Sequence, residues 1–139
     1  MAQQRKTDSF KGMWHCTYWY PSNGKPGTEE TSEYYCQAKQ RGDKVVFESL
    51  ANKPSHMVVN LTVDHSLATG SWTENTDPDG EFEGLEYSGA TQLLISADSA
   101  ALEGKWVGIG REKLADGSFE PQIYTGRFSL VKAGLTAAA

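Results

Sequence analysis

The sequence predicts a single all-β domain, an antiparallel up-and-down (meander) β-barrel of about eight strands. Turn-forming residues divide the chain into short runs that alternate in polarity or are rich in β-branched and aromatic residues. Several of these runs also carry a glycine two residues before a bulky aromatic side chain. A sandwich of two sheets is the second architecture that fits this pattern.

The expected strands lie between clusters of Pro, Gly, Asn and Asp, and none of them keeps a helical period over three turns. They cover residues 9–20, 31–40, 44–50, 57–63, 67–75, 82–96, 101–111 and 121–132. The barrel domain is therefore expected over residues 10–132, between a flexible N-terminal tail at 1–9 and a flexible C-terminal tail at 133–139.

Composition and charge exclude several classes of function. The chain has 13 Lys and Arg against 18 Asp and Glu, and no basic run, so binding to DNA or RNA is not expected. No segment has the roughly 20 apolar residues of a membrane span, and residues 1–9 are too polar for a secretory signal. A cytoplasmic chain is the expectation. His15, His56 and His65 lack partners at metal-ligand spacing, and the chain has no phosphate loop or Rossmann fingerprint, so neither a metal nor a cofactor is predicted.

The cysteines, Cys16 and Cys36, lie in the first two expected strands. Pairing these strands about the 21–30 connection, with partner numbers adding up to about 52, places Cys16 opposite Cys36. In a cytosolic protein two reduced, buried thiols are the first expectation. A cross-strand disulfide is the alternative if the chain is oxidised.

The recurring element consists of a glycine and an aromatic residue two positions apart, so the two share one face of a strand. We interpret that face as the barrel interior, where the glycine lets a coiled strand bend and the ring fills the space. Whether the rings fill the interior or line a binding pocket is left open by the sequence. The four copies are Gly12-Met-Trp14, Gly70-Ser-Trp72, Gly104-Lys-Trp106 and Gly126-Arg-Phe128.

The same parity places Glu74 on the inner face, where a carboxylate needs solvent or polar partners. It is either a solvated residue at the rim or a ligand-binding or catalytic group beside tyrosine hydroxyls, with Arg111 within reach of the same end. For 82–96 we favour Tyr87 as inward-facing, because the other parity would bury Glu86. The expected inward residues also include Trp14, Cys16, Tyr18, Tyr34, Cys36, Trp72, Thr91, Leu93, Trp106, Gly108, Gly110, Tyr124 and Phe128.

Residues 69–80, 87–94 and 103–111, with Phe10-Lys-Gly-Met-Trp14 and Tyr124-Thr-Gly-Arg-Phe128, resemble a bacterial domain found downstream of helix-turn-helix regulators. The resemblance covers about 10–132 and is similar in outline to calycin and lipocalin barrels, whose first strand also carries Gly-x-Trp. A looser likeness connects the chain to the β-barrels of bacterial cyclic-nucleotide antiphage systems. Because the chain shows neither a helix-turn-helix nor a membrane helix, it is expected to be a stand-alone version or an excised domain.

The resemblance implies a sensor that binds a small molecule and acts on an effector or regulator partner; a homo-oligomer is also open. A nucleotide or cyclic nucleotide could stack on Trp72 or Trp106, although only Arg111 and Arg127 offer cations near the rim. The expected ligand-binding residues are Trp14, Tyr18, Tyr34, Trp72, Glu74, Tyr87, Trp106, Arg111 and Tyr124.

Two alternatives accompany this hypothesis. Small barrels also host cyclisation and isomerisation, in which Glu74 would be the general acid or base. A barrel with a packed interior would act only as a protein-interaction domain, through its rim or an edge strand. We favour the non-enzymatic binding module and assign no catalytic residue.

Overall fold

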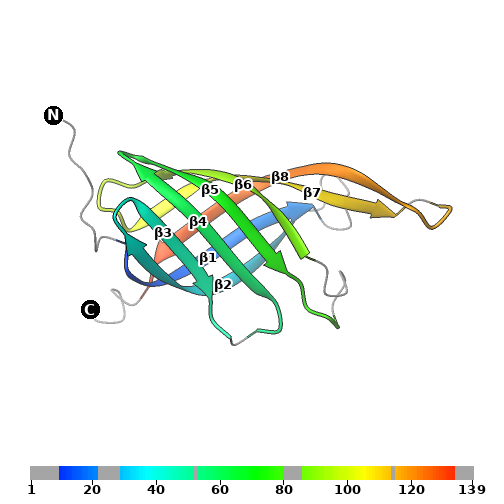
Figure 1. Ribbon diagram of the computed structural model, residues 1–139, viewed down its shortest axis with the longest axis horizontal. Coiled ribbons are helices and arrows are strands. Elements are labelled where there is room, and N and C mark those ends of the chain that lie inside the picture. Colours follow the sequence, from blue (N-terminus) through cyan, green and yellow to red (C-terminus); the bar gives the residue numbers. More distant parts are fainter. Residues whose placement is uncertain (1–9, 22–28, 52, 80–85, 114, 134–139) are drawn as a thin grey trace.

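The predicted meander barrel is present in the structure, a computed structural model that describes residues 10–21, 29–51, 53–79, 86–113 and 115–133 (Figure 1). Eight antiparallel strands each pair with their neighbours in sequence, and β1 also pairs with β8, which closes the barrel. The strands are β1 (Gly12–Pro21), β2 (Glu29–Arg41), β3 (Lys44–Ser49), β4 (His56–Asp64), β5 (Leu67–Asn75), β6 (Glu86–Ile95), β7 (Ala101–Lys113) and β8 (Phe119–Lys132). The sandwich alternative is therefore excluded.

The strand boundaries lie within a few residues of those predicted. The clearest difference is at β7 and β8, which continue to Lys113 and begin at Phe119 because their pairing extends to the turn between them. The residues 82–85 that were assigned to the sixth strand, and the tails at 1–9 and 134–139, lie outside the described residues.

The predicted register of the first hairpin is wrong by two positions. Trp14, not Cys16, is the partner of Cys36, and Cys16 lies opposite Tyr34. The cause is that β2 begins at Glu29, earlier than the expected start at residue 31, and pairs there with Pro21. Because the shift is an even number of residues, every side chain keeps its predicted face.

One half of the barrel interior is filled with apolar side chains packed around Trp14. The Trp14 ring is fully buried and makes an edge contact with Phe47, with 5.3 Å between ring centroids. Phe10, which precedes β1, stacks with Trp14, and its carbonyl accepts the indole N–H at 2.8 Å. Val45, Val59, Leu61, Ala68, Leu93, Leu102 and Leu130 complete this apolar half.

The glycine–x–aromatic residues face inward as predicted, but the ring that covers a glycine comes from another strand. Trp72 lies opposite Gly89 and reaches Gly108, and a Cβ atom on these glycines would meet the Trp72 ring at 2.8 and 2.6 Å. Trp106 lies opposite Gly126 in the same way, and Phe128 lies opposite Gly104. The prediction that the ring fills the space beside its own glycine is therefore corrected.

Glycine is also required where two strands come very close together. A Cβ atom at Gly104 would lie 2.0 Å from the backbone oxygen of Gln92, and one at Gly70 would lie 1.8 Å from that of Asn60. No side chain fits at these distances, so the strands can curve tightly into a barrel only because the residues are glycines.

The β7–β8 hairpin projects beyond the rest of the barrel (Figure 1). Pairing of β6 with β7 ends at Gly89 and Gly108, whereas pairing of β7 with β8 continues to Lys113 and Phe119. Along the projecting part, Ile109 and Ile123 are paired with each other and are 54% and 74% exposed. In the part of the chain that the structure describes, the end of the hairpin is thus a two-stranded ribbon.

We predict that Gly104→Ala destabilises the barrel, because the new methyl group collides with the backbone of β6 and must push two strands apart. Overpacking of this kind costs roughly 1–3 kcal/mol of unfolding free energy. Lys105→Ala is the matched control, since the Lys105 side chain is exposed on the outer face of the same strand. Urea unfolding followed by circular dichroism measures both variants. Equal midpoints for the two would contradict the close approach at Gly104.

Candidate functional site

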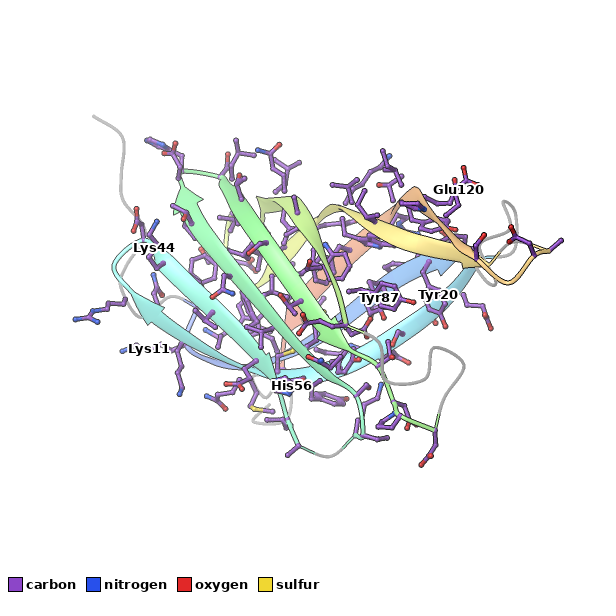
Figure 2. All side chains as sticks on the ribbon, turned by 45° about the vertical axis from the view of Figure 1, so that its right-hand side comes forward. Lys11, Tyr20, Lys44, His56, Tyr87 and Glu120 are labelled. Carbon is purple, nitrogen blue, oxygen red and sulfur yellow. The ribbon has the colours of Figure 1, made fainter. Side chains whose placement is uncertain are left out.

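Polar and aromatic side chains gather inside the barrel at the end opposite the apolar half. This end is formed where β1, β5 and β7 finish and where β2, β6 and β8 begin. Figure 2 shows Tyr20 and Tyr87 there, away from Lys11 and Lys44. We call the following residues the tyrosine end: Tyr18, Tyr20, Tyr34, Trp72, Glu74, Tyr87, Trp106 and Tyr124.

At the centre of the tyrosine end, the Glu74 carboxylate is held by tyrosine hydroxyls from two other strands. The Tyr18 hydroxyl lies 2.7 Å from both carboxylate oxygens, and the Tyr34 hydroxyl donates to Oε2 at 2.5 Å. Glu74 is only 8% exposed. Among the side chains that the structure describes, no lysine, arginine or histidine forms an ion pair with it. Neutral hydroxyls therefore supply the hydrogen bonds that a buried carboxylate needs.

The surroundings hold both phenols in their protonated form. Burial raises the pKa of Tyr18 and of Tyr34, and the neighbouring Glu74 charge raises each pKa further because a phenolate would lie beside a carboxylate. Because both phenols keep their protons, Tyr18 and Tyr34 act as hydrogen-bond donors toward Glu74.

A cation lies against the ring of Tyr34. Lys53 places its Nζ 4.3 Å from the centroid of that ring and donates to the backbone oxygen of Glu33.

Two tryptophans stand beside this cluster and are fixed by hydrogen bonds to the backbone. Trp72 and Trp106 meet edge to face, with 5.6 Å between their ring centroids. The Trp106 N–H donates to the carbonyl of Trp19 at 2.8 Å, and that of Trp72 lies 3.2 Å from the carbonyl of Ala90. An edge of Tyr18 contacts Trp106 as well. The aromatic rings and the carboxylate group thus form one connected arrangement.

The structure brings together most of the predicted ligand-binding residues. Tyr87 lies opposite Glu74, and Tyr124 lies opposite Gly108 beside the tryptophans. Trp14 is the exception, because it is packed in the apolar half. Arg111 pairs with Pro121 in the projecting hairpin, and its side chain lies outside the described residues.

One member of the tyrosine end was missed by the sequence prediction. Tyr20 tilts against Tyr18, with 5.7 Å between the ring centroids. It follows Tyr18 at the same strand parity, so extending the inner face by one more step would have included it.

Thr91, which was expected to face inward, is buried and donates its hydroxyl to the carbonyl of Lys105 at 2.7 Å.

Cys16 and Cys36 are buried free thiols. Burial raises the pKa of Cys16, and a hydrogen bond with Cys36 raises it further. A buried thiol with a raised pKa reacts slowly, because the thiolate is the nucleophile. The structure thus contains the free thiols of the first expectation, and the disulfide that was expected on oxidation stays a prediction.

We predict that neither cysteine reacts with a thiol reagent such as DTNB while the barrel is folded. Both should react in urea, because unfolding exposes them and returns their reactivity to that of a free cysteine. The released chromophore counts the reacting thiols in each condition. Reaction of either thiol at the same rate with and without urea would show that these side chains are not buried.

We predict that Tyr18 and Tyr34 ionise only when the barrel unfolds at high pH. Their pKa values are raised in the folded state, so the stability they contribute is complete below pH ~10 and is lost as the pH rises above it. Phenolate absorbance and circular dichroism, recorded together against pH, should show phenolates appearing as the sheet is lost.

Tyr34→Phe should remove one phenolate from that step, whereas Tyr35→Phe, which removes an exposed phenol of the adjacent residue, should leave it unchanged. Ionisation of all six tyrosines near pH ~10 in a barrel that is still folded would contradict the assignment.

Comparison with models of protein families gives no match for this chain, and no curated protein matches it in sequence. Within the described ranges, no group of three or more His, Cys, Asp and Glu side chains is placed to hold a metal ion. The described part of the chain also has no helix of the length and hydropathy needed to cross a membrane.

Proposed function

We propose that this barrel binds a small molecule at the tyrosine end, as a sensor module of a bacterial regulatory or defence system. The observation that carries the proposal is the buried Glu74 carboxylate, surrounded by tyrosines and tryptophans on the inner face. Burying a carboxylate costs several kcal/mol even after hydrogen bonding, and an apolar residue would pack the barrel at lower cost. Groups of this kind are concentrated at functional sites.

The contrast between the two halves of the interior supports the same proposal. Trp14 and Phe10 are fully buried, whereas Tyr18, Trp72 and Tyr124 point inward at the opposite end and are still partly exposed. A ligand seated there would cover aromatic surface and find polar groups that orient it, which is the usual composition of a small-molecule site.

The looser likeness to the barrels of cyclic-nucleotide antiphage systems suggests a nucleotide or cyclic nucleotide as the ligand, and the described residues support the base of such a ligand but not its phosphate. The Trp72 ring could stack with a base. A phosphate needs a cation, and each described Lys or Arg side chain is exposed except for Lys132, which is half-buried at the other end of the barrel. The described residues therefore include a ring on which a nucleobase could stack, but they include no cationic side chain inside the tyrosine end that could pair with a phosphate.

We predict that titration with a panel of nucleosides, cyclic nucleotides, amines and neutral aromatic metabolites gives at least one saturable signal by isothermal calorimetry and tryptophan fluorescence. Trp72→Phe should weaken that binding by roughly tenfold, since it replaces the indole of the site with a smaller phenyl ring and so reduces the aromatic contact with the ligand. Trp19→Phe is the control, because the Trp19 ring packs under Arg127, away from Glu74.

Failure of every compound to bind would favour the packed interaction domain and contradict the proposal. Incubation of bound compounds with wild type and Glu74→Gln decides the enzymatic alternative. Turnover that disappears in Glu74→Gln while binding persists would identify an enzyme.

A further inference from the structure

The tyrosine end contains the Glu74 carboxylate, and no described lysine, arginine or histidine side chain forms an ion pair with it; the Lys53 ammonium contacts the Tyr34 ring instead. Both tyrosine hydroxyls donate to Glu74, and neither brings a positive charge to it. The donors are neutral, so they stabilise the carboxylate and leave its charge in place. A ligand with a positive group would complete this site electrostatically.

The carboxylate also keeps some capacity to accept hydrogen bonds. Its two oxygens offer about four lone-pair positions. Tyr18 shares a single hydroxyl proton between the two oxygens, and Tyr34 occupies one position on Oε2. Oε1 therefore receives only a share of the Tyr18 hydroxyl proton, and it could accept a further hydrogen bond from an N–H group of a ligand. A planar group with two N–H donors matches a carboxylate especially well.

The aromatic walls favour the same sign of charge. The face of an aromatic ring is its negative region, so it attracts cations and repels anions. The protein already uses this attraction at the edge of the cluster, where the Lys53 ammonium lies 4.3 Å from the centroid of the Tyr34 ring. Trp72 and Tyr18 supply further rings beside Glu74, Tyr20 packs against Tyr18, and all three rings are partly exposed.

We propose that the ligand of the tyrosine end is a small organic cation, with an ammonium, amidinium or guanidinium group directed at Glu74 and an apolar or planar body against Trp72. The inference rests on the proposed function, which supplies the site, and adds the chemical class of the ligand. An anionic ligand would face the Glu74 carboxylate and the negative faces of the rings together, so it is disfavoured.

The test uses benzamidine, benzamide and benzoate, which share one planar body and differ in charge, with 2-phenylethylamine as a second cation. Calorimetric titration of the full chain should rank benzamidine at least about tenfold above benzamide, with benzoate weakest, because a charge-assisted pair adds to the ring contacts. This ranking needs no variant, so it holds as a test even if a substitution at Glu74 prevents folding.

Glu74→Gln should lower benzamidine affinity to that of benzamide and leave benzamide binding unchanged. The matched control is Glu33→Gln, which removes an exposed carboxylate on the outer face, next to Tyr34 in β2, and should leave the ranking intact.

The outcomes separate this inference from the proposed function. If benzamide, benzoate or an anionic nucleotide binds as tightly as both cations, the proposal of an organic cation as ligand is refuted. The proposal that the barrel binds a small molecule would still stand. Loss of benzamidine affinity in Glu33→Gln equal to that in Glu74→Gln assigns the effect to general charge attraction and also overturns the organic cation as ligand. Absence of binding by these probes and by the whole panel overturns both.

Discussion

Closure of the barrel depends on strands that approach one another more closely than side chains allow. Gly70 and Gly104 meet the backbone of the next strand at distances that no Cβ atom tolerates, and Gly89, Gly108 and Gly126 leave room for indole rings. The rings of Trp72 and Trp106 occupy the space above these glycines, and their N–H groups donate to backbone carbonyls. Gly89 and Gly126 connect the site to the curvature of the sheet, because a Cβ atom on either would also lie 1.9 or 2.0 Å from a backbone oxygen of another strand.

The Glu74 carboxylate is the costly element of this arrangement. A hydrogen bond to a charged group contributes roughly 1.5–3 kcal/mol to the free energy of unfolding, whereas burying a charge without such partners costs several kcal/mol. The two tyrosine hydroxyls therefore offset part of the cost and link β1, β2 and β5 through one carboxylate. The apolar half around Trp14 supplies the packing energy that lets the other half keep a polar interior.

Much of this organisation could be predicted from the sequence, because side chains in a strand alternate with a period of two. Parity alone placed Glu74, Trp72 and Trp106 on the inner face. It could not show that Tyr18 and Tyr34, among four candidate tyrosines, meet Glu74, since that depends on how far the strands are staggered. The same limitation explains the shifted register of the first hairpin and the glycine contacts made across strands.

The projecting end of the β7–β8 hairpin should unfold more easily than the closed barrel. Among the residues that the structure describes, Ile109–Lys113 of β7 pair with β8 alone, so this segment is held there by a single set of interstrand bonds. A two-stranded ribbon is only marginally stable in water. It can therefore open and close as a local unfolding unit while the eight-stranded body stays intact. Amide hydrogens in this ribbon would then exchange with solvent sooner than those of the closed barrel.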